Sequence, residues 1–126
     1  MSRHPLFDRS RLTVLPLNYR EHDLDVSSVK PLEPCEPVRD ALEETAASIR
    51  RAREQNRAVV LMMGAHVIRS GLQRYLIDML ERGLVTCLAF NGAGLIHDYE
   101  FASIAATTES VSRYIRDGRF GLWRET

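Results

Sequence analysis

Two short turns hold the residues of this sequence whose types and spacing best suit chemistry. Gly64-Ala65-His66 follows the apolar run AVVLMM (Ala58–Met63), and Asn91-Gly92-Ala93-Gly94 follows the run VTCLAF (Val85–Phe90). Each run is typical of a buried parallel strand, and a helical pattern follows each turn. Ligands of α/β proteins bind at the carboxyl ends of neighbouring parallel strands, so the pattern predicts one site made from both turns.

The second turn suits a phosphate group. Glycine lets the backbone approach a ligand closely, and a helix that opens there supplies free N–H groups and partial positive charge. The dinucleotide-binding pattern G-x-G-x-x-G is incomplete, because His97 stands in place of the third glycine. A tight strand–helix turn without a ligand is the alternative interpretation.

His66 and His97 each lie just beyond the end of an expected strand, and Asp98 follows His97 directly. If the strands are neighbours, the two imidazoles face one pocket, which favours general acid–base chemistry. The same three residues are an alternative set of divalent-metal ligands, although no metal is assigned. Hydrogen bonding of each histidine to nearby backbone is the purely structural alternative.

Arg69 and Glu100 are candidates for contacting a substrate. Arg69 is expected in the first turn of a helix that begins near His66, where a positive side chain is unfavourable to the helix dipole. An anionic ligand or an acidic partner would offset that charge, and a solvated arginine is the alternative. Glu100 adds a carboxylate to the same edge.

Helical periodicity precedes and follows the first strand. One helix is expected from Pro37 to about Asn56, and another from His66 to Gly83. The residues expected on their buried faces are Val38, Ala41, Leu42, Thr45, Ala46, Ile49 and Ala52 in the first, and Ile68, Leu72, Tyr75, Leu76, Met79 and Leu80 in the second.

Two further helices are expected after the second strand. The first covers Ile96–Ala106, and TTES (Thr107–Ser110) is expected to cap the second, which stops at Gly118. Their buried faces are expected to carry Tyr99, Ala102 and Ala106, and then Val111, Tyr114 and Ile115.

These elements predict a Rossmann-like three-layer α/β domain over residues 37–126, in which parallel strands alternate with helices. Residues 1–36 are predicted to be an N-terminal arm and a proline-rich linker, where RLTVLPL (Arg11–Leu17) is at most an edge strand. Met62, Met63 and Cys87 are expected in the core. The sequence predicts no functional role for His4 or His22.

Composition limits the class of protein. The chain has 126 residues, enough for about one domain, and its 17 Lys and Arg balance 17 Asp and Glu. This balance favours neither nucleic acid nor a membrane surface as a partner. The two cysteines lack disulfide or zinc spacing, and neither a signal peptide nor an apolar run of about 20 residues is present, which indicates a cytoplasmic protein.

The C-terminal segment is unusually apolar. Phe120, Leu122 and Trp123 need a surface to pack on. A doubly wound sheet with only two clear strands is also undersized. Both observations favour a piece or a shortened version of a longer protein.

The segment from Arg57 to Tyr114 resembles the deoxyhypusine synthase family, and more closely a group of uncharacterised bacterial deoxyhypusine-synthase-like proteins. The family has a Thr-Ser-Asn-Leu turn, a Ser-Ser-Gly helix start and a Thr-Thr-Ala-Gly-Gly-Val-Glu-Glu-Asp turn at nearly the same separation. Their places are taken here by Gly64-Ala65-His66-Val67, Arg69-Ser70-Gly71 and the stretch Phe90–Asp98.

The resemblance implies a domain that binds NAD through both turns, within a homotetramer whose active sites lie between subunits. The family's asparagine is His66 here, and the glutamate that handles the polyamine is His97. The family's catalytic lysine belongs to a C-terminal half without a counterpart in this chain, and neither Lys30 nor Trp123 matches that region. The candidate cofactor contacts are Gly64, Ala65, His66, Val67, Asn91, Gly92, Ala93 and Gly94.

Three hypotheses remain open. The first is an NAD-type nucleotide-binding domain of a deoxyhypusine-synthase-like protein, for which the resemblance implies aminoalkyl transfer to an unknown acceptor. The second is an acid–base or metal-dependent lyase or hydrolase that uses His66, His97 and Asp98. The third is a non-catalytic module whose apolar C-terminal residues pack on another subunit. The expected partners are a small-molecule amine or nucleotide and further copies of the chain.

Overall fold

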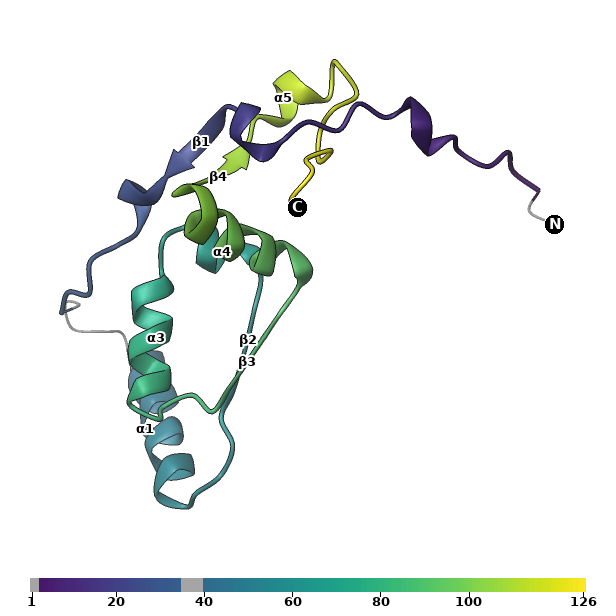
Figure 1. The fold of residues 1–126 in the computed structure, drawn as a ribbon. Coiled ribbons are helices and arrows are strands. Elements are labelled where there is room, and N and C mark those ends of the chain that lie inside the picture. Colours follow the sequence, from purple (N-terminus) through teal and green to yellow (C-terminus); the bar gives the residue numbers. More distant parts are fainter. Residues whose placement is uncertain (1–2, 35–39) are drawn as a thin grey trace.

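The computed structural model describes residues 3–34 and 40–126, which form a mixed α/β structure with two small sheets. One sheet is the parallel pair β2 (Val60–Met63) and β3 (Cys87–Phe90), and the other is the antiparallel pair β1 (His22–Asp25) and β4 (Ala106–Glu109). Figure 1 shows α4 (Gly92–Ile104) between the two sheets. The other elements are α1 (Asp40–Glu54), α2 (Ala65–Arg69), α3 (Gln73–Glu81), α5 (Val111–Tyr114) and 3-10 turns at Arg9–Arg11, Leu17–Tyr19 and Val26–Ser28.

β2 and β3 confirm the prediction of neighbouring parallel strands. They pair in register, from Val60 with Cys87 to Met63 with Phe90. Each strand begins two residues later than predicted. Thr86 accounts for the late start, because its hydroxyl accepts a hydrogen bond from the Val59 N–H and replaces ladder pairing there.

The prediction that these strands are buried on both faces is wrong. Val60 is 54% exposed and Met62 is 79% exposed, and Cys87 is also exposed. Met62 is therefore not a core residue, whereas Met63 is half-buried. The physical reason is that α2, which follows β2 directly, packs against α4 and leaves this face of the strands open.

The predicted single helix from His66 to Gly83 is two helices, α2 and α3. The break lies at Gly71, whose φ of +83° is left-handed and whose carbonyl accepts a 2.8 Å hydrogen bond from the Lys30 N–H. A Cβ at this position would lie 2.1 Å from the Ser28 carbonyl oxygen. The close passage of the N-terminal segment therefore requires glycine, and the helix cannot continue through it.

The predicted helix ends are confirmed at two positions. Asn56 and Gly83 have φ values of +52° and +64°, as expected for residues that follow a helix. The predicted end at Gly118 is wrong, because α5 already ends at Tyr114. The expected buried face of α1 is wrong, since Leu42 is 56% exposed and Thr45 is exposed. The predicted helix start at Pro37, the residues Cys35 and Val38 and the boundary between the predicted domains lie outside the described residues.

Two predictions near α4 are wrong. Thr107–Glu109, expected to be part of a helix cap, belongs to β4, which pairs with β1 in a register that sets His22 opposite Glu109. Tyr99 and Ala102 are exposed, and the inner face of α4 instead carries the residues Gly94, His97, Glu100 and Ile104. An ion pair buries Glu100, so apolar periodicity alone points to the wrong face.

The C-terminal segment packs on the N-terminal segment of the same chain. The main buried cluster is Leu17, Tyr114 and Trp123, in which the two aromatic rings meet edge to face with centroids 5.0 Å apart. The Trp123 indole N–H donates to Glu109 at 2.7 Å, and Leu15 forms a bridge with Trp123. Trp123 is therefore not available to another subunit, although Phe120 is 45% exposed.

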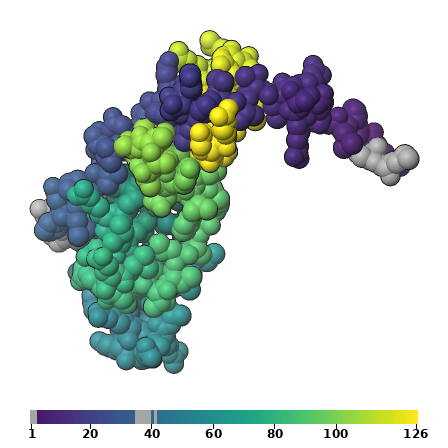
Figure 2. Space-filling view, viewed as in Figure 1, coloured from purple at the N-terminus to yellow at the C-terminus, as the bar shows by residue number. Residues whose placement is uncertain are grey.

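Much of the predicted arm is part of the fold. β1 lies within it, and Tyr75 accepts a hydrogen bond from the Glu33 N–H at 3.2 Å. Only the first described residues, purple in Figure 2, extend away from the body of the molecule.

Gly71→Ala tests the contact that breaks the helix. We expect a loss of about 3 kcal/mol or more in the free energy of unfolding, from left-handed strain and overlap with Ser28. Gly83→Ala is the matched control, because its φ is +64° but a Cβ meets nothing within 4 Å. The control is expected to cost about 1–2 kcal/mol in urea unfolding. Equal losses for the two variants would contradict the contact.

Candidate functional site

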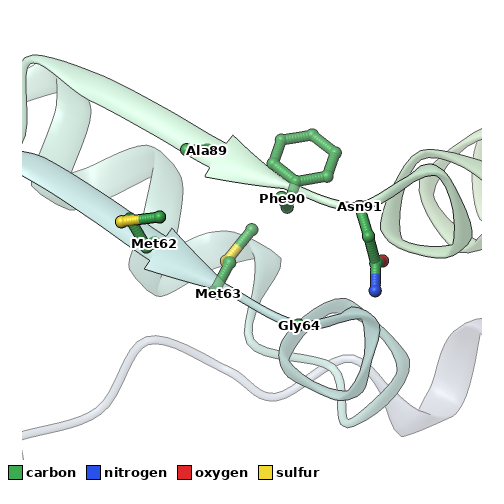
Figure 3. Close-up of a pocket in the computed structure, with 6 residues that line it drawn as sticks. All are labelled: Met62, Met63, Gly64, Ala89, Phe90 and Asn91. Carbon is green, nitrogen blue, oxygen red and sulfur yellow. The ribbon is translucent and has the colours of Figure 1, made fainter.

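The two predicted turns meet at one edge of the parallel sheet. Gly64 ends β2 and Asn91 ends β3, and both line a cleft of about 480 Å³. Figure 3 shows both residues at this edge, with the Met63 side chain between the strands. The remaining lining residues are Met62, Ala89 and Phe90. The cleft is therefore mostly apolar and opens beside the starts of α2 and α4.

Asn91 begins α4 as an N-cap. Its side-chain oxygen accepts a 3.1 Å hydrogen bond from the Gly94 N–H. Gly92 and Ala93 are exposed in the first turn, whereas Gly94 is buried, and a Cβ on Gly94 would lie 2.8 Å from the Phe90 ring. Gly94 thus packs under Phe90, while the turn before it presents backbone N–H groups to solvent.

The cleft has the features that a nucleotide requires. A Cβ added to Gly64 or Gly92 would meet nothing within 4 Å, so a ligand can approach the backbone at both turns. Phe90, which is 39% exposed, offers apolar surface for a flat ring, and the start of the 13-residue helix α4 offers partial positive charge to a phosphate. The residues present fit a ring and an adjacent phosphate, which are parts of NAD.

A second group of polar residues lies deeper, and the sequence prediction missed three of its members. The Arg20 Nη1 donates to Glu100 Oε1 at 2.7 Å, and the Thr107 hydroxyl donates to Glu100 Oε2 at 2.6 Å. Arg20, Glu100 and Thr107 are 6%, 2% and 0% exposed. Glu100 is therefore closed off from a substrate in this structure.

Arg20 also contacts groups on the N-terminal side. Its Nε donates to His22 Nδ1 at 3.1 Å, and its Cζ lies 5.8 Å from the centre of the Trp123 ring. Among the described residues, its buried Nη2 has no hydrogen-bond partner. His22, which carried no signal in the sequence, thus belongs to this group.

His97 links the buried group to the surface. Its Nδ1 lies 2.7 Å from the Thr107 hydroxyl oxygen, and the residue is half-buried. Glu100 lies three residues later on the same face of α4. This spacing was the one signal in the sequence that could have predicted that His97 and Glu100 belong to the same group. Residues of α4, β4 and the N-terminal segment therefore form one connected chain of hydrogen bonds.

The pKa values of Glu100, His97 and His22 are all lowered. Burial raises the pKa of Glu100, but hydrogen bonds from Arg20 and Thr107 outweigh that effect and hold it below the ordinary value of 4.5. Burial lowers the pKa of His97 below 6.5, Glu100 opposes this, and Arg69, Arg20 and His66 reinforce it. Burial and Arg20 likewise lower the pKa of His22. Glu100 is ionised and both histidines are largely neutral at pH 7.

The other predicted site residues lie on α2 and α4. His66 and Asp98 are exposed, and Arg69 is half-buried in the last turn of α2, so the expected clash with a helix N-terminus is wrong. The reason is that α2 has only five residues. The Arg69 Nε donates to the Thr108 hydroxyl at 3.2 Å. Ala65 and Val67 are half-buried beside the cleft edge.

The alternative metal set is not brought together. Within residues 3–34 and 40–126, the structure contains no group of three or more His, Cys, Asp or Glu side chains placed to hold a metal ion.

Among the helices of residues 3–34 and 40–126, none has the length and apolar character needed to cross a membrane.

Comparison of the chain with protein-family models, with curated proteins and with solved structures found no match.

Glu100→Gln tests the buried ion pair. Removing one charge leaves Arg20 buried without its partner, so we expect a loss of about 3–5 kcal/mol in the free energy of unfolding. The double variant Arg20→Met, Glu100→Leu is expected to recover much of it, because neither charge is then desolvated. A loss below about 1 kcal/mol for Glu100→Gln would match an exposed pair and contradict the burial.

Acid is expected to destabilise the fold in two steps. His97 and His22 have lowered pKa values, so their contribution is complete above pH 6.5 and is lost as the pH falls below that value. Glu100 adds a second loss as the pH falls below 4.5. Urea unfolding from pH 8 to pH 3 measures both steps. An unfolding free energy that rises on acidification would contradict these shifts.

Proposed function

We infer that this chain is an NAD-type nucleotide-binding domain of a deoxyhypusine-synthase-like protein, with the nucleotide at the ends of β2 and β3. The observation that carries this proposal is the in-register parallel pairing, which brings Gly64 and Asn91 to one cleft of about 480 Å³. Such a volume lies in the range of small-molecule sites, about 300–1,000 Å³. A Rossmann-like three-layer arrangement is part of the same proposal.

In the proposed binding mode, the phosphates and the ring of the nucleotide contact different parts of the cleft. Phosphate oxygens accept hydrogen bonds from the backbone N–H groups of Gly92 and Ala93, where the dipole of α4 favours negative charge. A ring packs against Phe90. His66 and Val67, which follow Gly64, are then placed to contact the ligand from α2.

Aminoalkyl transfer belongs to the proposal only through the resemblance. Bound NAD supplies a hydride acceptor to an amine substrate. The resemblance places His66 and His97 where the family has an asparagine and a glutamate. Aminoalkyl transfer therefore needs a test of its own, apart from the test of nucleotide binding. Cys87 is exposed and forms no disulfide with any residue of 3–34 and 40–126, which fits a reducing compartment such as the cytoplasm.

Homo-oligomerisation is proposed from the open face of the parallel pair. Parallel strands are normally covered on both faces, whereas Val60 and Met62 are 54% and 79% exposed. On α4, the large side chains Leu95, Ile96 and Tyr99 are also exposed. A second copy that covers β2 would bury Val60 and Met62 and complete a layer.

Asn91→Asp tests the nucleotide site by isothermal titration with NAD. An aspartate keeps the N-cap and suits the helix dipole, so the thermal midpoint is expected to stay or rise, while its charge repels the phosphates. We expect affinity to fall about tenfold or more, which corresponds to about 1.4 kcal/mol. Asn91→Ser is the neutral control and is expected to bind like the parent. An absence of NAD binding by the folded parent chain would remove the proposal.

Met62→Glu tests the proposed oligomer. A charge on the exposed face of β2 cannot be buried without a large desolvation cost, so light scattering is expected to show dissociation towards monomer. Met62→Leu keeps the face apolar and is expected to keep the parent's mass. A parent chain that is monomeric at high concentration would contradict the proposal.

A further inference from the structure

The buried hydrogen-bond chain fixes where the proton of His97 resides. Glu100 is an ionised acceptor, with Arg20 Nη1 at 2.7 Å on one oxygen and the Thr107 hydroxyl at 2.6 Å on the other. A threonine hydroxyl has one proton, and Thr107 donates it to Glu100. The Thr107 oxygen can therefore only accept from His97 Nδ1, which lies 2.7 Å away.

It follows that neutral His97 carries its proton on Nδ1 and has a free lone pair on Nε2. Nε2 has no hydrogen-bond partner among the described residues, and the half-buried ring leaves this side open to a ligand. The order Glu100–Thr107–His97 holds the imidazole in a single tautomer and orientation. An acceptor carboxylate behind a histidine serves the same purpose in catalytic triads.

The neighbouring helix α2 supplies a cation, Arg69, near His97. Arg69 and His97 bond to adjacent residues of β4, Thr108 and Thr107, and the charge of Arg69 helps to lower the pKa of His97. The Arg69 Nε is bonded to Thr108, and its terminal nitrogens have no partner within the described ranges. Thr108 has a φ of +67°, a strained value for a β-branched residue, and such strain is typical of functional sites.

We propose that His97 is a general base for an anionic substrate, a carboxylate or phosphate that also carries an O–H or N–H group. Arg69 binds the anionic group, His97 Nε2 accepts the proton, and Thr107 and Glu100 are positioning residues. This site does not depend on the proposed nucleotide site, because it uses the middle of α4 instead of its first turn.

The proposed step balances without a further reactant. The substrate O–H or N–H bond breaks, an Nε2–H bond forms, and the electron pair stays on the substrate. The imidazolium charge is stabilised by Glu100 through the Thr107 hydroxyl, and the charge left on the substrate faces Arg69. Return of the proton to the product restores neutral His97. The groups whose charges act on His97 are Glu100, Arg69, Arg20 and His66.

NMR of the nitrogen-labelled full chain tests the resting state of this site. Two-bond nitrogen–proton spectra are expected to show the Nδ1–H tautomer of His97 and a pKa below 6.5. Thr107→Ser keeps the hydroxyl and is expected to keep the tautomer, whereas Thr107→Val is expected to mix the tautomers. The Nε2–H tautomer in the parent chain or in Thr107→Ser would overturn the proposal, and this holds even if Thr107→Val fails to fold.

Inorganic phosphate is the probe for the anionic group. Bound beside Arg69, it is expected to raise the pKa of His97 by about 1 unit, because an opposite charge favours the imidazolium. Arg69→Gln is expected to abolish this shift, and Arg113→Gln, an exposed site on α5, is expected to keep it. Asn91→Asp, which tests the nucleotide site, is expected to leave the pKa shift of His97 unchanged. Failure of the nucleotide proposal can therefore be distinguished from failure of the His97 proposal. No phosphate shift in the parent, or an undiminished shift in Arg69→Gln, would overturn the proposal.

Discussion

The buried ion pair between Arg20 and Glu100 is the interaction on which the rest of this structure depends. It joins the N-terminal segment to α4, and through Thr107 it reaches β4. Burial of two charges carries a desolvation cost, which is offset here because both carboxylate oxygens are hydrogen-bonded and the guanidinium lies over Trp123. The small apolar cluster of Leu17, Tyr114 and Trp123 packs beside this pair, so the charged and apolar contacts act together.

α4 connects the two candidate sites. Its first turn lies at the cleft between β2 and β3, and its middle carries His97 and Glu100 one turn apart. The sites differ in chemistry, since the cleft is mostly apolar while His97 is linked through Thr107 to a buried carboxylate. The anionic substrate proposed for His97 differs from the polyamine that the resemblance implies, so the two proposals concern different ligands.

Local features of the structure were predictable, and long-range ones were not. The parallel strands, their two turns and the helix ends at Asn56 and Gly83 depend on neighbouring residues and were found. The break at Gly71 depends on Ser28, more than forty positions earlier along the chain, and β1 reads HDLD without apolar alternation. Glu100 was predicted to contact a substrate, because nothing near it in the sequence reveals Arg20, eighty positions away.

The most direct test of the account is a titration of the labelled full chain with NAD, followed by the backbone amide signals. The account predicts saturable shifts that are shared by the two turns, Gly64–Val67 and Asn91–Gly94, while the amides of Leu17 and Trp123 stay unchanged. Shifts at one turn without the other, or shifts confined to residues away from both, would contradict the claim that these turns form one nucleotide site.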